Sequence, residues 1–479
     1  MSRTGPGALA RVIVYRGPSG FTGRVPGQDK ATRAVTRSGE AALARMVVPA
    51  PAWQGGHCRE HGRCREPGEL DRRDEEVPAV TGDGDLGLDE VLGAAEDAAP
   101  VESVDVVASN LEKRFSATDV SFLFVDLLGQ EVVRLPRAGR AGQPRDRADR
   151  FDLVGSVYDR VLRSQRLHQE DDGEGGCRLV APVTNRGDCL GVLEMVVPEA
   201  DDAVREAVSQ TAHALAYIVV TDRRFTDLYH WGRRTTEVSL AAEIQHQLLP
   251  TAPCCEAAQF TLACGLVPAD DIGGDTYDYA LDQNLLHLSI TDAMGHDTDS
   301  ALLATLTVNA LRGARRAGHS ILEQAYTAHR AITARTRGLI TGQLLRVRLD
   351  TGACELVNAG HPWPLRLRGA RVEEVAVEVN MPFGVPAPVT YQVQQLRLEP
   401  GDRLMLLTDG MCERAAASVD LAAIMHATRA EHPREVVRAL TSAVFDACGG
   451  SLPDDATTMV LDWHGSRRGQ RRTSAGSDT

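Results

Sequence analysis

Four aspartates at the ends of short strand-like segments constrain the fold of this chain more than any other feature. Asp275, Asp292, Asp409 and Asp454 all have small or polar neighbours in turn-like sequence. A single aspartate in a turn usually only hydrogen-bonds to nearby backbone. Four of them at strand ends predict a fold that gathers oxygen ligands around a hard cation, because Mg²⁺ and Mn²⁺ prefer carboxylates to sulfur or nitrogen ligands.

The bulk composition indicates an ordinary globular protein with several domains. At 479 residues the chain is too long for one core, and its 43% apolar and 25% charged residues are typical values. The net charge of −14 argues against nucleic-acid binding, which needs a surplus of Lys and Arg. The sequence has no signal peptide and no run of about eighteen apolar residues, so we expect a cytoplasmic protein that does not bind membranes.

Composition and periodicity divide the chain into five regions. The first is rich in Gly, Pro and Arg without helical or strand periodicity, and the last is short and basic, so both are predicted to be disordered. Between them lie two folded domains and a connecting helix. The expected bounds are 1–84 for the leader, 85–222 for a mixed domain, 223–250 for the connecting helix, 251–464 for a strand-rich domain and 465–479 for the tail.

The pattern in 85–222 predicts a mixed α/β domain. A helix and a strand open it, and a hairpin follows, with Gly187 supplying the positive φ that a tight turn needs. A closing helix completes the region. This order of elements, with a hairpin of the form Pro-Val … Gly … Leu-Gly-Val-Leu, resembles a GAF sensory domain. The resemblance implies an unidentified small-molecule ligand for this domain.

Region 223–250 is predicted to be one helix, since Leu240, Ile244 and Leu248 recur at four-residue spacing and Pro250 ends the pattern. A helix between a sensor and an enzyme suggests a lever that transmits a signal. The alternatives are plain packing of the apolar stripe or a seam between two copies, which would make the protein a homodimer.

Region 251–464 reads as short strands joined by tight turns, with a few helices. Residues 286–291 alternate apolar and polar side chains, as a half-buried strand does. Residues 403–407 form a continuous apolar run that predicts a buried strand leading to Asp409. Helices are expected after Asp292 and over 434–448, so the fold class is α/β, of the α+β type.

Six motifs in this region resemble those of PPM-type metal-dependent serine/threonine phosphatases, in the branch named for stage II sporulation protein E. They keep the family's order and spacing. The upstream run Glu243-Ile-Gln-His-Gln-Leu-Leu-Pro250 also resembles the family's entry helix, so the likeness covers about 236–463. The motifs are Ile272-Gly-Gly-Asp-Thr-Tyr-Asp278, Thr291-Asp-Ala-Met-Gly-His296, Asn358-Ala-Gly-His-Pro362, Pro400-Gly-Asp402, Thr408-Asp-Gly-Met-Cys-Glu413 and Asp454-Asp-Ala-Thr457.

The resemblance implies an α-β-β-α sandwich with two antiparallel sheets and two Mn²⁺ or Mg²⁺ ions between them. By motif match, Asp275 and Asp292 would hold the shared metal site with the backbone carbonyl of Ala293. Asp409 and Asp454 would bind the second ion. Two such ions activate water for attack on phosphorus and offset charge on the phosphoryl oxygens.

Neighbouring residues receive other roles. Asp278 is expected to orient a metal ligand through hydrogen bonds, and Glu413 to stabilise the turn after Asp409. His361 is either an acid near the site or a hydrogen-bonded turn residue. The family usually has glycine where this chain has Asp297, which makes the geometry of that loop a departure from the family pattern.

The motifs together predict an enzyme that hydrolyses phosphoserine or phosphothreonine on a regulatory protein. By family analogy the substrate would be a phosphorylated anti-anti-sigma factor, with activity controlled by the GAF-like domain. The alternative is a scaffold with weak or no catalysis that acts through protein interaction. Loss of an aspartate would favour the scaffold, and the sequence retains all four.

Overall fold

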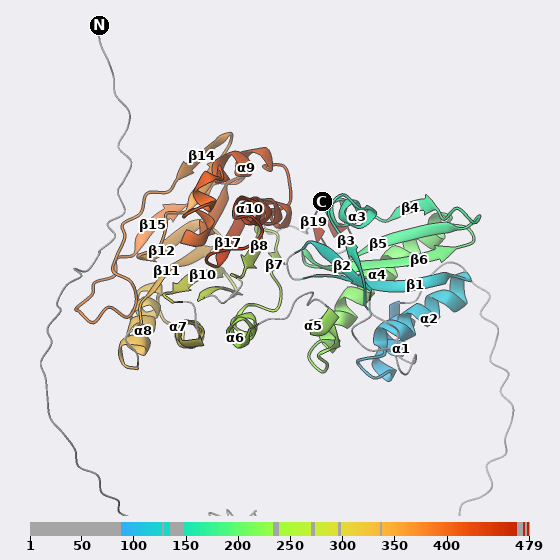
Figure 1. Ribbon diagram of the computed structural model, residues 1–479, viewed down its shortest axis with the longest axis horizontal. Helices are drawn as coiled ribbons and strands as arrows, with labels where there is room; N and C mark the ends of the chain where they lie inside the picture. The colour runs from blue at the N-terminus through green and yellow to red at the C-terminus, as the bar shows by residue number, and fades with distance from the viewer. Residues whose placement is uncertain are drawn as a thin grey trace, which may run out of the picture. The chain divides into compact units, whose positions relative to one another are not determined.

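The computed structural model describes residues 88–126, 129–134, 148–232, 239–269, 274–295, 298–335, 338–466, 473–474 and 477–478 (Figure 1). All of them belong to one compact unit, Val80–Thr479. The predicted leader, 1–84, lies outside the described residues.

The first part of this unit is a six-stranded antiparallel sheet with helices on both faces. Its strands run in the order β3-β2-β1-β6-β5-β4. The elements are α1 (Leu88–Asp97), α2 (Ser103–Phe115), β1 (Thr118–Val125), β2 (Glu131–Arg134), β3 (Asp149–Asp152), α3 (Val157–Ser164), β4 (His168–Asp171), β5 (Cys177–Asn185), β6 (Asp188–Val197) and α4 (Asp202–Asp222).

The predicted hairpin forms β5 and β6 of this sheet. Asn185 pairs with Asp188 across a two-residue turn in which Arg186 and Gly187 have φ values of 47° and 84°. Two left-handed residues in a row fit the right-handed twist of the flanking strands. One apolar cluster fills the face under α1, α2 and α4, and a second fills the face under α3. The predicted elements are present, whereas assignment to the GAF class stays a prediction.

The connecting segment is not the single helix predicted over 223–250. After α4 the chain forms α5 (Leu228–Gly232) and α6 (Leu240–Leu248), with non-helical residues at 223–227. Ser239 caps α6, because its side chain accepts a hydrogen bond from the backbone N–H of Ala242. The apolar spacing alone predicts one helix, whereas the cap at Ser239 begins a separate helix, α6.

The second part of the unit contains two antiparallel sheets. The first sheet has the order β15-β12-β11-β10-β9 and the second the order β14-β13-β16-β17-β8-β7. Their strands are β7 (Cys254–Glu256), β8 (Phe260–Val267), β9 (Asp275–Leu281), β10 (Leu285–Ala293), β11 (Ile340–Arg348), β12 (Ala353–Ala359), β13 (Leu365–Arg368), β14 (Arg371–Glu374), β15 (Gln394–Arg397), β16 (Arg403–Leu407) and β17 (Ala456–Trp463).

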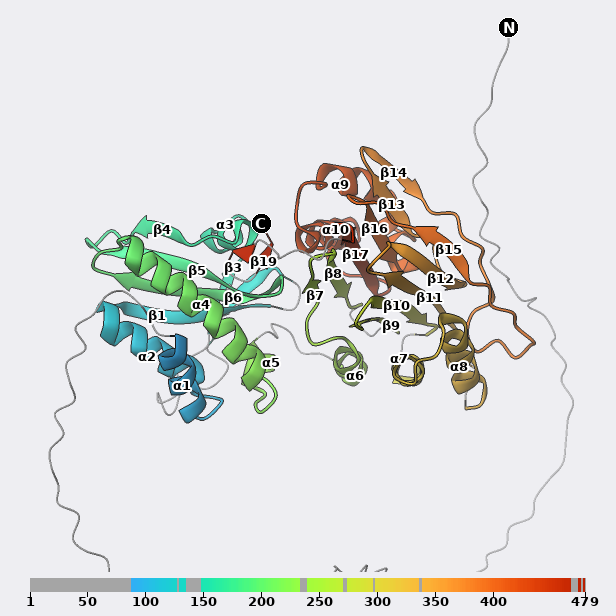
Figure 2. The same cartoon turned by 180° about the vertical axis from the view of Figure 1, so that it is seen from behind.

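The two sheets pack face to face over one apolar core, which includes Phe260, Ile290, Leu356, Leu406 and Trp463. Helices cover both outer faces, as Figures 1 and 2 show. The helices are α7 (Thr298–Arg316) and α8 (Ile321–Thr333) on the first sheet, and α9 (Leu421–Ala427) and α10 (Pro433–Ala447) on the second. This α-β-β-α sandwich confirms the predicted fold class.

Because helices cover the outer faces of both sheets, the burial of β10 differs from what its alternating sequence predicts. The residues of β10 between its apolar positions were expected to face solvent, yet Ser289 and Thr291 are buried. They lie on the outer face of the sheet, where α7 packs against it. No helix among the described residues has both the length and the apolar character needed to cross a membrane.

Part of the C-terminal tail, predicted to be disordered over 465–479, has described structure. Two short strands pair there, β18 (Thr473–Ser474) and β19 (Ser477–Asp478). The hydroxyl of Ser477 accepts a hydrogen bond from Arg434 and donates one to Glu256. These contacts hold the described tail residues, a feature that the basic composition did not indicate.

Candidate metal centre

The two-residue period of the strands brings polar side chains together at one end of the inter-sheet core. Ile290 faces the core from β10, so Asp292, two residues further on, faces the same space. Asp275 of β9 is its direct cross-strand partner. Residues paired in this way have Cβ atoms about 5 Å apart, and like charges there repel each other unless a cation lies between them.

The second sheet contributes two hydroxyl groups to the same place. Thr408 follows β16 and Thr457 lies near the start of β17, both in phase with core residues of their strands. Thr408 Oγ1 and Thr457 Oγ1 donate hydrogen bonds of 2.7 and 2.6 Å to Asp275 Oδ2. One oxygen of Asp275 is thereby fixed, and Oδ1 is left for another partner.

Asp409 and Asp454 reach this end of the core from adjacent turns of the second sheet. Asp409 begins a short 3₁₀ turn after β16, and Asp454 lies two residues before the start of β17. The turns lie in close contact at Gly410, where an added Cβ would sit 1.9 Å from the backbone oxygen of Asp455. Only glycine permits that approach, which explains its place after Asp409.

A second glycine serves the first sheet. A Cβ at Gly274 would sit 2.1 Å from the carbonyl oxygen of Ala293, the backbone oxygen that the motif match assigns to the metals. The carbonyl oxygen of Gly274 in turn accepts a hydrogen bond of 3.2 Å from the N–H of Ala293. The Gly-Asp and Asp-Ala segments therefore lie side by side because residue 274 has no side chain.

The carboxylates form a site of concentrated negative charge. Burial raises the pKa of Asp275 well above its usual value, and the charges of Asp292 and Asp455 raise it further. Burial also raises the pKa of Asp292, with the charges of Asp409 and Asp454 as further causes. The pKa of Asp409 is raised by burial and then by Glu413 and Asp454. Carboxylates held against their own repulsion favour a bound cation.

The donor set fits hard divalent cations. Asp275 is buried, Asp292 and Asp409 are half-buried and Asp454 is exposed, so the four carboxylates differ in their access to solvent. Among the described residues, no three or more His, Cys, Asp or Glu side chains are grouped closely enough to hold a metal ion as they stand. The residues therefore fit Mg²⁺ or Mn²⁺ by the chemistry of their carboxylate and carbonyl oxygens and by the negative charge that they share.

Asp278 does not point into this site. It lies three residues after Asp275 on β9 and therefore on the opposite face of the sheet. Its carboxylate is clamped by Arg312 and Arg315 of α7, with N–O distances of 2.8 Å to each guanidinium. Instead of orienting a metal ligand, as the sequence predicted, Asp278 anchors a helix to the sheet.

Glu413 and Arg414 flank Asp409. The N–H of Glu413 donates to the carbonyl of Asp409 at 2.8 Å, which fits the predicted role in the turn. The Glu413 charge also raises the pKa of Asp409, so it adds to the negative field. Arg414 has a φ of 53° and donates from Nη1 to the carbonyl of Pro453 at 3.1 Å.

His361 is a buried residue of a turn. Its Nδ1 lies 2.9 Å from Thr341 Oγ1, and its backbone N–H and carbonyl both bond to the side chain of Asn358. Burial lowers its pKa to about 3, so the ring is neutral near pH 7. Of the two roles left open by the sequence, the geometry favours the structural one. Asp297 lies outside the described residues, and the geometry of its loop stays a prediction.

Sequence reasoning missed four residues that the structure brings to the site. Two are the threonines that bond Asp275, the third is the buried carboxylate of Asp455, and the fourth is a glutamine of α6. Thr408 directly precedes Asp409 and Thr457 lies three residues after Asp454, so strand phase could have identified both threonines. The four residues are Thr408, Thr457, Asp455 and Gln245.

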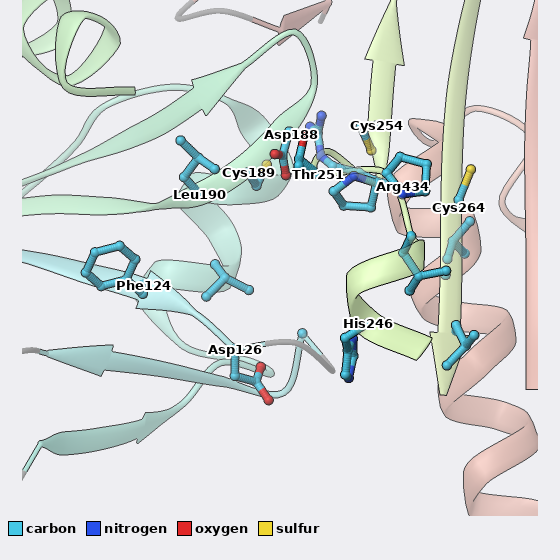
Figure 3. A pocket seen from close by; sticks show the side chains of 18 of the residues that line it. Phe124, Asp126, Asp188, Cys189, Leu190, His246, Thr251, Cys254, Cys264 and Arg434 are labelled. Atoms are coloured by element: carbon cyan, nitrogen blue, oxygen red, sulfur yellow. The ribbon is translucent and has the colours of Figure 1, made fainter. Parts of the chain in front are cut away.

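One large cavity in the molecule is separate from these carboxylates. It has a volume of about 1030 Å³, and its lining includes Phe124, Leu190, His246, Cys254 and Arg434 (Figure 3). None of the four motif aspartates lines it. The candidate metal centre is therefore the carboxylate cluster at the end of the sandwich, not this cavity.

Comparison with known proteins places the second part of the chain among described families. The family model described as Stage II sporulation protein E (SpoIIE) matches residues 282–464. This range includes Asp292, Asp409 and Asp454, and Asp275 lies just before it.

Two curated relatives from Bacillus subtilis (strain 168) are similar in sequence. Phosphoserine phosphatase RsbU is 22% identical over 234 residues, which cover 47% of this chain and 70% of RsbU. Stage II sporulation protein E is 24% identical over 197 residues, which cover 40% of this chain and 24% of that protein. A solved structure of the PP2C phosphatase domain and a fragment of the regulatory domain of SpoIIE from Bacillus subtilis has 15% identity. It covers 62% of this chain and 82% of its own, with a TM-score of 0.39.

Proposed function

Residues 282–464 form a stage II sporulation protein E-type phosphatase domain, and from this premise we propose that the protein hydrolyses phosphoserine or phosphothreonine on a regulatory protein. The observation that carries the proposal is the carboxylate cluster at the end of the two-sheet core. Aspartates with raised pKa values come there from both sheets, and such perturbed carboxylates concentrate at functional sites.

The residues of the site divide between two ion positions. Asp275 and Asp292, with the carbonyl of Ala293, would hold the shared position, and Asp409 and Asp454 would complete the second. When bound, two Mn²⁺ or Mg²⁺ ions supply activation of water and neutralise charge on the phosphoryl oxygens. The protein's own contribution is to fix these oxygens, through the threonine bonds to Asp275 and the close backbone contacts at Gly274 and Gly410.

The substrate class follows from the relatives and the motif resemblance. A relative named as a phosphoserine phosphatase supports a phosphorylated serine. An anti-anti-sigma factor is the proposed phosphoprotein, by family analogy. The GAF-like domain, predicted over 85–222, is proposed to bind a small ligand and to control the phosphatase domain. Its position ahead of that domain in the chain supports this role.

Phosphatase assays of the full chain test the proposal directly. Hydrolysis of a phosphoserine peptide and of p-nitrophenyl phosphate is measured with Mn²⁺ or Mg²⁺ and with EDTA. We expect turnover that EDTA abolishes and a fall of at least about 100-fold in Asp409→Asn, which corresponds to about 2.7 kcal/mol of barrier.

The matched control is Asp282→Asn, which changes an exposed aspartate in the turn joining β9 and β10, at the other end of the same strands. It should retain the parent rate. An Asp409→Asn enzyme with full metal-dependent activity would contradict the assignment. No turnover by the parent chain, together with no thermal shift on adding Mn²⁺, would favour the scaffold alternative.

A further inference from the structure

Helix α6 carries a buried polar side chain on the face that packs against the phosphatase domain. Ala241, Ala242 and Leu248 form the apolar part of that face, and Gln245 lies among them with 1% of its surface exposed. Burial of an amide without partners costs about 1–3 kcal/mol in proteins. A glutamine kept at this position therefore points to specific partners.

Those partners belong to the carboxylate site. Gln245 Nε2 donates to the carbonyl oxygen of Asp275 at 2.7 Å and to Asp455 Oδ2 at 2.5 Å. The same Asp455 oxygen accepts the backbone N–H of Asp275 at 3.3 Å, and its other oxygen accepts the N–H of Ala269 at 2.8 Å. The carbonyl and the N–H of Asp275 are thus both held, one by Gln245 and the other by the carboxylate that Gln245 bonds.

The NH₂ group of the Gln245 amide matches this geometry, whereas its buried Oε1 has no hydrogen-bond partner among the described residues. Two acceptors face residue 245, and the NH₂ group of glutamine offers two donors without a charge. Glutamate at this position would add a third carboxylate beside Asp275 and Asp455. An apolar side chain would fill the space but leave the buried carboxylate of Asp455 one donor short.

We propose that Gln245 is a positioning residue of the metal site, which fixes Asp275 by bonding its carbonyl and by holding Asp455 in place. The inference rests on the proposed metal-dependent function and adds a side chain of α6, a helix ahead of the domain bound predicted at 251, to the parts that build the site. Gln245 touches neither substrate nor the reacting atoms and acts through the backbone of Asp275.

A second contact keeps α6 in place independently of Gln245. Arg312 of α7 donates from Nη2 to the carbonyl of Leu248, the last residue of α6, at 2.6 Å. Figures 1 and 2 show α6 beside α7 in both views. Loss of the Gln245 amide should therefore disturb Asp275 and Asp455 without detaching the helix.

The test is calorimetric titration of the metal-free full chain with Mn²⁺, in the parent and in Gln245→Met. Methionine has a similar length and volume but no donor. We expect Mn²⁺ affinity to fall about 10-fold to 100-fold, the range usual for residues that orient metal ligands. The KM for a phosphoserine peptide should change little, because the proposed role of Gln245 is exerted through the backbone of Asp275. Gln247→Met changes an exposed glutamine on the same helix and should match the parent.

The outcomes separate this inference from the proposed function. Weaker Mn²⁺ binding in Gln245→Met supports the positioning role, even if the parent chain hydrolyses no phosphopeptide. Parent-like affinity in Gln245→Met overturns the positioning role, even if the parent is an active phosphatase. Circular dichroism and melting of the metal-free proteins provide the folding control. If Gln245→Met and the conservative Gln245→Asn both unfold, the residue is a structural part of the core and the proposal fails.

Discussion

Asp275 shows how one side chain can depend on several distant parts of the sequence. Its carboxylate is bonded by threonines that follow β16 and begin β17, and its backbone is bonded by Asp455 and by a glutamine of α6. The energetic reason is burial, because a desolvated carboxylate needs donors or a cation to stay ionised. The site is therefore a property of the assembled sandwich, and no single motif contains it.

At the residue scale, His361 predicts a pH dependence of stability. Burial lowers its pKa to about 3 in the folded state, from an ordinary value near 6.5. The stability gained from keeping the ring neutral is complete above about pH 6.5 and is lost as the pH falls toward 3, since only the unfolded chain then binds the proton. We expect the melting temperature of the parent to fall more steeply over that interval than that of His361→Gln.

Thermal melts at matched pH values in both proteins measure this difference, because the other titrating groups are common to both. His319→Gln, which changes an exposed histidine, serves as the control and should follow the parent curve. Parallel curves for the parent and His361→Gln would show that the buried ring contributes no pH dependence.

The four aspartates could be predicted from the sequence because each lies in a recognisable motif. The residues that hydrogen-bond to them could not. Thr457 sits in the last motif, yet its hydroxyl bond to Asp275 depends on the pairing of strands from opposite ends of the domain. Asp278 shows the opposite error. Its motif suggested hydrogen bonds that orient a metal ligand, whereas strand alternation places its side chain on the opposite face of the sheet, against α7.

At the element scale, α7 is attached to the first sheet by a buried ion cluster. Arg312 and Arg315 both bond Asp278, and Arg312 also bonds the last carbonyl of α6. One arginine thus joins a strand and two helices. The apolar face of α7 supplies most of the packing, while the arginine fixes where the two helices meet.

Replacing Arg312 by leucine tests this attachment. The change leaves the carbonyl of Leu248 without its described donor and removes one of two cations from a buried carboxylate, so we expect a loss of about 3 kcal/mol in the free energy of unfolding. Urea denaturation measures it. Arg316→Leu, an exposed position on the same helix, should stay within about 0.5 kcal/mol of the parent. Equal losses of unfolding free energy in both variants would mean that the ion cluster stabilises the fold no more than an exposed arginine does.

Periodicity predicted most elements of the chain but misjudged the buried face of α6. The four-residue stripe pointed to Leu240, which is 68% exposed, whereas the face that packs contains Gln245. An apolar pattern cannot identify a buried polar residue whose partners lie in another part of the fold. Capping by Ser239, which starts the helix afresh, was likewise outside the reach of the hydrophobic pattern.

At the scale of the whole molecule, the phosphatase domain extends further toward the N-terminus than the bound predicted at residue 251. The sequence placed its first residue at 251, after the predicted connecting helix. In the structure, α6 packs on α7 and bonds the carboxylate site. We therefore expect the functional domain to begin at Ser239.

Two truncated chains measure where the domain begins. A chain over 239–479 should bind Mn²⁺ as the full protein does, and a chain over 251–479 should bind it about 10-fold more weakly or lose its fold. The same pair tests control by the first domain, since removal of 1–238 should alter the basal hydrolysis rate. Equal Mn²⁺ affinity in both truncated chains would show that α6 only connects the two domains and does not help to build the metal site.

The two close backbone contacts at the site have a consequence for recognising inactive relatives. A Cβ at residue 274 or 410 would collide with a neighbouring carbonyl oxygen, so any other residue there must displace a ligand-bearing segment. A descendant of this chain could keep every aspartate and still have lost its chemistry through a single change at either glycine. Surveys for silent members of such a lineage should therefore inspect these two positions before counting carboxylates.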